Sequence, residues 1–173
     1  VGRAAREMAA QGANLWGVSQ SSNHYWVHTW GDEVRKRARQ TGVFAEETAK
    51  LGLVYGAFFG FRVLHEVRRY TRYGQVKDDV ERTLRYHHCD GKVLRFKRYS
   101  VTKDQRNMVG KFHAKKGGIS AASSAEKHHA EADRALRGML DEFASPYARL
   151  ARPGEKTSCG VVWGQATADQ DAE

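Results

Sequence analysis

The longest apolar run in the chain is LGLVYGAFFGF, and small residues recur through it at every fourth position. On an α-helix, residues four apart lie one above the other, so this spacing predicts a helix with one smooth face and an otherwise bulky, apolar surface. Glycine at every fourth position of an apolar segment is typical of membrane helices that contact each other closely. We expect this helix over 43–67. Its small-residue face comprises Thr48, Gly52, Gly56 and Gly60, and the three glycines are the expected helix–helix contacts.

The apolar part of the expected helix is short for a membrane span. If the Arg62 side chain reaches out to the headgroups, the run from Leu51 to Leu64 has fourteen residues, which is roughly 21 Å of helix. A bilayer core is about 30 Å thick. Two interpretations therefore stay open: a short transmembrane helix completed by a partner helix, and a buried core helix of a soluble protein.

Several other segments have a readable pattern. Residues 1–13 predict a short helix, the alternation within 92–101 predicts a strand, and 126–143 predict an amphipathic helix. The segment 24–40 places tryptophans four residues apart ahead of a basic cluster. That pattern suits either an interfacial helix at a membrane or a soluble amphipathic helix with its tryptophans turned inward.

The segment after Gly74 is charged, with a thin apolar stripe. Val76, Val80 and Leu84 recur every four residues, which predicts a helix, and the neighbouring charges predict pairs such as Asp79 with Arg82 or Glu81 with Arg85. A stripe this thin favours a solvated helical extension that touches one neighbour. We do not expect it to form part of a core.

Together these patterns predict a mainly α-helical chain. It has one short glycine-faced helix, which we expect to be transmembrane, a charged helical extension and flanking amphipathic helices. Charged residues make up 28% of the chain and its mean hydropathy is −0.68, so we expect no large globular core. The expected divisions are an N-terminal extension with a Trp-rich interfacial helix (1–42), the glycine-faced membrane helix (43–67), a basic helical or extended segment (68–116), and a C-terminal amphipathic helix and tail (117–173).

The chain carries a net charge of +9, and its positive residues gather in one segment. Between 62 and 116, sixteen Lys or Arg accompany six Asp or Glu, so this segment alone carries +10. Such a segment attracts phosphates, either of nucleic acid or of lipid headgroups. The acid-poor start VGRAAREMAA, with Val in first place, is compatible with a removed targeting peptide.

Motifs for catalysis or for a cofactor are missing from the sequence. It contains no nucleophile elbow, phosphate-binding loop or dinucleotide fingerprint, so we predict no enzyme and no cofactor. The two separated cysteines and the three histidine pairs lack the spacing of a zinc site, so we predict no metal. The strongest binding signals are two runs that mix basic and aromatic residues, RRYTRY and RFKRY. They suit either contacts with phosphates and bases or a lipid-headgroup interface that includes cardiolipin-like lipids.

One stretch resembles a known family. LGLVYGAFFGFR is similar to the short apolar helix of subunit e of the mitochondrial F-type ATP synthase, in which G-x-x-x-G is followed by an aromatic and a basic residue. The resemblance implies a non-catalytic, supernumerary inner-membrane subunit that pairs with a subunit g-like helix and supports dimerisation and membrane curvature. Gly56 and Gly60 would be the helix contacts, with Gly52 extending them. The residues expected to reach lipid headgroups or an acidic partner are Arg62, Arg68, Arg69 and Arg72.

Two further functions are consistent with the sequence. The main alternative is a basic mitochondrial ribosomal protein in which 51–61 is buried against other proteins and 62–116 contacts rRNA. A third is a supernumerary subunit of another respiratory complex. The subunit e interpretation predicts location in the mitochondrial inner membrane.

Overall fold

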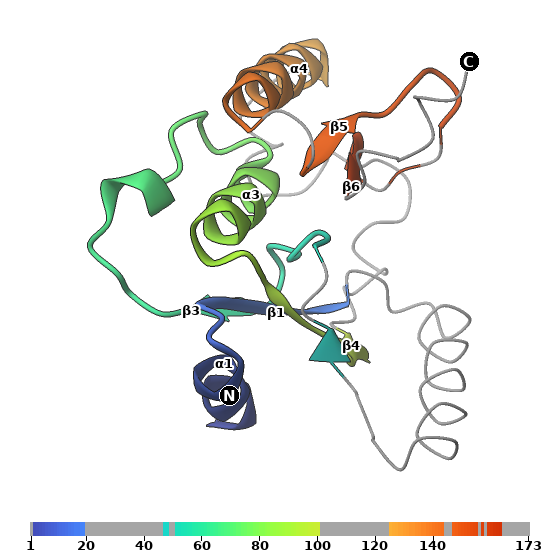
Figure 1. Cartoon of the computed structure of the whole chain (residues 1–173). Helices are drawn as coiled ribbons and strands as arrows, with labels where there is room; N and C mark the ends of the chain where they lie inside the picture. The colour runs from blue at the N-terminus through green and yellow to red at the C-terminus, as the bar shows by residue number, and fades with distance from the viewer. Residues whose placement is uncertain are drawn as a thin grey trace, which may run out of the picture.

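The computed structural model describes residues 2–19, 47–48, 51–100, 125–143, 147–155, 157 and 159–163. Figure 1 shows these residues as layers: helix α1 lies on one face of a small sheet, helix α3 lies on the other face, and helix α4 lies beyond α3 beside a short hairpin. The elements are α1 (Gly2–Gln11), β1 (Leu15–Ser19), β2 (Glu47–Thr48), β3 (Phe59–Phe61), the 3-10 turn η1 (Val67–Arg69), α3 (Asp78–Asp90), β4 (Leu94–Ser100), α4 (Ala125–Glu142), β5 (Ala148–Leu150) and β6 (Val161–Trp163).

The main sheet is mixed. Its strands lie in the order β2-β4-β1-β3, with β1 parallel to β4 and the other neighbours antiparallel. Strands β5 and β6 form a separate antiparallel pair. Because connecting parallel strands requires a long crossover, the parallel pairing joins two segments that are far apart in sequence, 15–19 and 94–100.

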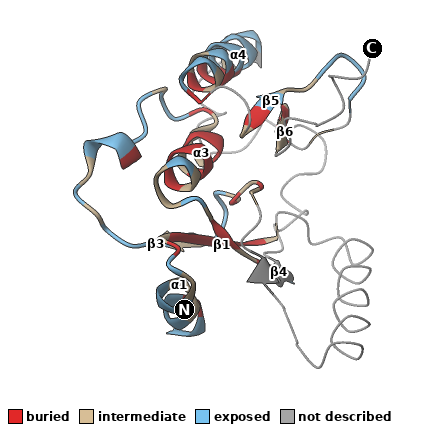
Figure 2. Ribbon diagram, in the orientation of Figure 1, coloured by how far each residue is buried: buried red, intermediate tan, exposed pale blue. Residues whose placement is uncertain are grey.

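Side chains of β1 alternate between the two faces of this sheet, as the pleat requires. Trp16 and Val18 point toward α1 and pack with Leu94 and Phe96 of β4. Leu15 points the other way and packs with Tyr86 of α3. The sheet is therefore covered on both faces, and Figure 2 shows β1 as mostly buried between them.

Helix α3 is the centre of the structure. Val80 and Leu84 are fully buried and pack against Leu136 and Met139 of α4 and against Val161 of β6. The expectation of a solvated extension is therefore wrong. The thin apolar stripe is sufficient because α3 also buries charged side chains, Glu81 and Arg85, as a matched pair. The helix ends where Gly91 adopts a left-handed backbone and its N–H bonds to the carbonyl of His87.

The glycine-faced helix is also a wrong prediction. Residues 51–58 form an irregular connection, and Phe59–Phe61 form the strand β3. Gly60 faces the Trp16 indole, and a Cβ at this position would collide with its Nε1 atom. Gly52 likewise lies against the guanidinium group of Arg95. The glycines permit close contacts within one domain, and the aromatic residues around Gly60 favour a strand.

The fold class must be corrected accordingly. The described residues combine helices with two small sheets around three hydrophobic clusters, so the chain is not mainly α and it does form a core. Within the described ranges, no helix is both long and apolar enough to cross a bilayer. The helices predicted near 1–13 and 126–143 and the strand within 92–101 are confirmed. The Trp-rich segment 24–40 lies outside the described residues.

Candidate functional site

An open groove lies between β3, α3 and the connection that joins them. Its volume is about 410 Å³. One wall is β3, the floor is α3, and the other wall is the connection around η1. The lining side chains are mainly apolar or aromatic, with two arginines: Phe59, Phe61, Val63, Leu64, His65, Arg69, Tyr70, Thr71, Arg82 and Tyr86.

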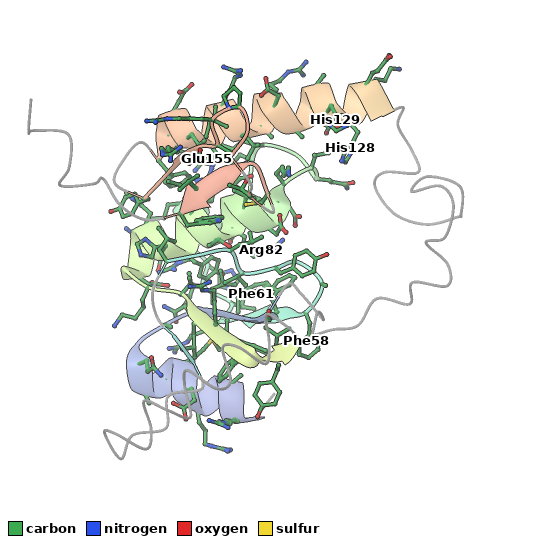
Figure 3. The ribbon with its side chains drawn as sticks, turned by 90° about the vertical axis from the view of Figure 1, so that its right-hand side faces the viewer. Phe58, Phe61, Arg82, His128, His129 and Glu155 are labelled. Carbon is green, nitrogen blue, oxygen red and sulfur yellow. The ribbon has the colours of Figure 1, made fainter. Side chains whose placement is uncertain are left out.

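The floor and the first wall form an aromatic stack with a cation. Phe59 and Phe61 are two apart on a strand, so their rings share the α3 face of the sheet and stack with centroids 6.2 Å apart. Arg82 and Tyr86 are one helical turn apart on α3 and meet these rings. The Arg82 guanidinium lies 4.2 Å from the centroid of Phe59, and Tyr86 lies 6.1 Å from Phe61. Figure 3 shows Arg82 and Phe61 facing each other across the space between α3 and the sheet.

Several apolar side chains at the mouth of the groove face solvent. Phe61 is 47% exposed, Tyr70 is 49% exposed, and Val63 is more exposed still. Single exposed apolar residues are ordinary, but a cluster of them around a groove marks an interaction surface.

Arg82 carries unused hydrogen-bonding capacity. Its Nη2 atom bonds to Asp78 one turn earlier on α3. Its Nη1 atom is buried and has no hydrogen-bond partner among the described residues. A buried donor without a partner is costly, so a movement of the Arg82 side chain that brought Nη1 to a ligand in the groove would gain hydrogen bonds.

The second wall is fixed to α3 by buried ionic contacts. Arg69 donates two hydrogen bonds to Asp90, at 2.9 and 2.7 Å, and this contact raises the pKa of Arg69. The Glu81 carboxylate accepts the backbone N–H groups of Arg72 at 2.7 Å and Tyr73 at 3.0 Å. These contacts hold the wall to α3 at residues 69 and 72–73, so this part of the groove has a defined shape before any ligand binds.

A second network lies behind the groove, toward α4. Arg85 bonds to Glu81 at 2.7 Å and to both carboxylate oxygens of Glu142. Tyr73 donates its hydroxyl to Glu142 at 2.9 Å. The Arg85 contact lowers the pKa of Glu142, and burial together with Glu142 raises the pKa of Tyr73. All charges in this network are paired, so its role is structural.

The structure separates the residues that the sequence grouped as a site. Gly52, Gly56 and Gly60 share no common face: Gly52 is buried against Arg95, Gly56 is exposed near Asp79, and Gly60 lies in β3 under Trp16.

The four predicted arginines divide into two kinds. Arg62, Arg68 and Arg72 are exposed along the connection that forms the groove wall. Arg68 bonds to Glu66 at 2.8 Å, and Arg72 bonds to the carbonyl of Val67. Arg69 is buried and its acidic partner is internal, Asp90. This contact lies within the chain, whereas the prediction for Arg69 concerned lipid headgroups or an acidic partner and stays a prediction.

Sequence reasoning missed the combination of Phe59, Phe61, Arg82 and Tyr86. The available signal was the strand-like alternation F-G-F, which the apolar helix assignment hid. The spacing of four between Arg82 and Tyr86 places both on one side of α3. Only the pairing of β3 with β1 brings the two elements together.

The histidine pairs do not form a metal site in the described part of the chain, where no group of three potential ligands comes together. His87 and His88 pack against the ring of Tyr147, and His88 also contacts Phe143. His128 and His129 lie side by side near the start of α4, as Figure 3 shows. His24 and His28 lie outside the described residues.

No protein-family model matches the sequence, no curated protein is a significant relative, and no solved structure matches the chain. The resemblance to subunit e accordingly stays a prediction, and its expected helix is absent from 51–67.

Proposed function

We propose that the chain binds single-stranded RNA, with the groove between β3 and α3 as its binding site. The observation that carries the proposal is that two exposed aromatic residues, Phe61 and Tyr70, line the same groove as Arg82. Single-stranded nucleic acids bind to surfaces of this kind, since bases stack on aromatic rings and on arginine while basic residues neutralise phosphates.

Charge around the groove supports the same partner. Arg62, Arg68 and Arg72 are exposed on its outer wall, and the segment that contains them has the chain's positive excess. Phosphates passing along this wall would meet cations while bases enter the groove. This develops the alternative that the sequence raised, a basic protein that contacts RNA. A ribosomal setting remains a prediction.

The described residues give no support to the subunit e function. That function depends on a helix at the GAFFGF motif, where the structure has a connection and a strand. The basic residues after this motif lie along the groove wall instead of flanking a membrane helix.

Fluorescence anisotropy with labelled oligonucleotides tests the proposal. The protein is titrated into uridine and adenosine 12-mers and into an RNA duplex of equal length, at several salt concentrations. We expect single strands to bind more tightly than the duplex. We expect Phe61→Ala to weaken single-strand binding by about 5- to 150-fold, corresponding to the roughly 1–3 kcal/mol of one stacked base.

Phe58→Ala is the matched control. Phe58 lies three residues before Phe61 and is similarly exposed, but it packs edge-on against Trp16 on the α1 side of the sheet. Figure 3 labels both side chains. Circular dichroism establishes that each variant is folded. The proposal is wrong if folded Phe61→Ala binds as tightly as the unmodified chain, or if Phe58→Ala loses as much affinity.

A further inference from the structure

The register of β3 leaves backbone groups unused at the edge of the sheet. In an antiparallel pair, only every second residue directs its N–H and C=O toward the partner strand. Val18 donates its N–H to the carbonyl of Phe58, and Arg62 donates its N–H to the carbonyl of Asn14. Residues 58, 60 and 62 therefore face β1. Phe59 and Phe61 direct their N–H and C=O away from it.

No other strand takes up these groups within the described ranges. β3 is the outer strand in the order β2-β4-β1-β3. No described residue hydrogen-bonds to the backbone of Phe59 or Phe61. An edge strand of this kind offers a row of free donors and acceptors.

The free groups belong to the same two residues whose rings line the groove. In an extended residue, the N–H and the C=O point to the same side of the strand, next to each other. The Watson–Crick edge of a nucleobase also carries a donor beside an acceptor. That edge is free only when the base is unpaired, and proteins that read single-stranded RNA commonly bond to it.

We propose that the groove takes one unpaired nucleobase, and that the free N–H and C=O of Phe59 or Phe61 bond to its Watson–Crick edge. The inference rests on the proposed function and adds the means by which an unpaired base is selected over a paired one. A peptide strand could bond to the same edge. The groove favours the nucleobase because only two residues of β3 offer free groups, while the surrounding exposed charges, Arg62, Arg68 and Arg72, suit phosphates.

Chemically modified oligonucleotides test this assignment. A uridine 12-mer is compared with one made of 3-methyluridine, whose methyl group blocks the Watson–Crick edge, and with one made of 5-methyluridine, whose methyl group lies off that edge. If adenosine binds more tightly, the corresponding pair is N6,N6-dimethyladenosine and 7-deazaadenosine. We expect about tenfold weaker binding for the edge-blocked oligonucleotide, equivalent to the absence of one or two hydrogen bonds, and little change for its control.

Amide hydrogen exchange of the full chain gives a second measurement. Oligonucleotide binding should slow exchange at Phe59 or Phe61, whereas Gly60, which faces β1, provides the internal reference. Equal affinity for blocked and unblocked oligonucleotides overturns this inference while leaving RNA binding intact. Protection of these amides by a second protein chain, and never by RNA, also overturns it. Failure of every unmodified oligonucleotide to bind overturns the proposed function itself.

Discussion

The two sides of α3 use the same residue type in opposite ways. On the side toward α4, Arg85 is 1% exposed and lies between Glu81 and Glu142, so its charge is fully matched inside the protein. On the side toward β3, Arg82 lies over the ring of Phe59, and one of its terminal nitrogens has no partner in the described part of the chain. Although they are three residues apart on one helix, Arg85 has its charge matched inside the fold, whereas Arg82 lines the groove.

This contrast shows why the charge of a segment overstates its binding surface. The positive excess of 62–116 includes Arg69 and Arg85, which internal carboxylates neutralise. The exposed cations near the groove are fewer, and Arg68 among them already contacts Glu66. The ability to bind phosphates depends on which arginines the fold leaves unmatched.

Removing a charge from the buried ion pair of Glu81 and Arg85 should have the largest effect on stability. Glu81→Ala removes the partner of Arg85 and the acceptor for two backbone N–H groups, those of Arg72 and Tyr73. Losing one member of a buried ion pair typically costs about 3–5 kcal/mol. We expect the unfolding free energy, measured with urea, to fall by about that amount and the groove wall to loosen.

The pair of Arg137 and Asp133 on α4 is the matched control. It has the same spacing of four and a similar distance, 2.9 Å, but both side chains are mostly exposed. Exposed pairs of this kind contribute about 0.3–0.5 kcal/mol. If Asp133→Ala destabilises the protein as much as Glu81→Ala does, burial of the Glu81–Arg85 pair is not the reason for its large contribution to stability.

The groove wall itself can be tested at the glycines. Gly60→Ala places a Cβ against the Trp16 indole, which is buried and confined between Phe58 and Phe96. Overpacking of this kind costs about 1–3 kcal/mol. We expect the urea midpoint to fall accordingly and RNA affinity to fall with it, because β3 carries Phe61.

Gly56→Ala provides the comparison within the same glycine series. Gly56 is exposed, its backbone is not left-handed, and a Cβ there would meet Asp79 at 3.3 Å. We expect a change of at most about 0.5 kcal/mol. Equal effects at both glycines would contradict the assignment of Gly60 to a strand under Trp16 and favour a common helix face.

The elements that the sequence predicts correctly are those with strong local patterns. The amphipathic stretch 126–143 and the alternating stretch 92–101 fold as expected. The hydrophobic pattern of each has the period of one kind of secondary structure only, helix for the first and strand for the second. The stretch 51–61 carries two competing signals, a spacing of four and the alternation F-G-F. The strand forms because Gly60 accommodates Trp16, a residue forty-four positions earlier in the chain. Local sequence does not contain that contact.

From the sequence, only the kinds of residue that form the site could be predicted. Basic and aromatic residues around 68–73 indicated a binding surface, and Arg69 and Tyr70 of this run do line the groove. The buried role of Arg69 depends on Asp90, which lies at the far end of α3. The position of Arg82 over Phe59 depends on tertiary packing between a helix and an edge strand. Neither follows from spacing along the chain.

Removing exposed cations near the groove should weaken RNA binding without changing the free energy of unfolding. Arg72→Gln and Arg68→Gln are each expected to weaken RNA binding a few-fold, equally for all base sequences. For each phosphate that the variant no longer neutralises, the salt dependence of the logarithmic affinity should become shallower by about 0.7. Anisotropy titrations between low and moderate salt measure this slope. An unchanged slope would place the phosphates elsewhere on the protein.

The smallest predicted effect on stability concerns His87, which packs on the side of α3 that faces Tyr147. Its ring packs against Tyr147, and its Nδ1 atom is buried with no hydrogen-bond partner within the described ranges. Burial together with the neighbouring His88 lowers its pKa. The unfolded chain protonates this residue below its ordinary pKa of about 6.5, and the folded chain does so only at lower pH. Stability should therefore fall as pH decreases from about 6.5 and level off below the folded pKa. His87→Phe keeps a ring against Tyr147 but cannot be protonated, so urea unfolding at a series of pH values should show a shallower decline. If the decline is unchanged, His87 titrates alike in both states, and the packing of α3 against the hairpin does not exclude its charged form.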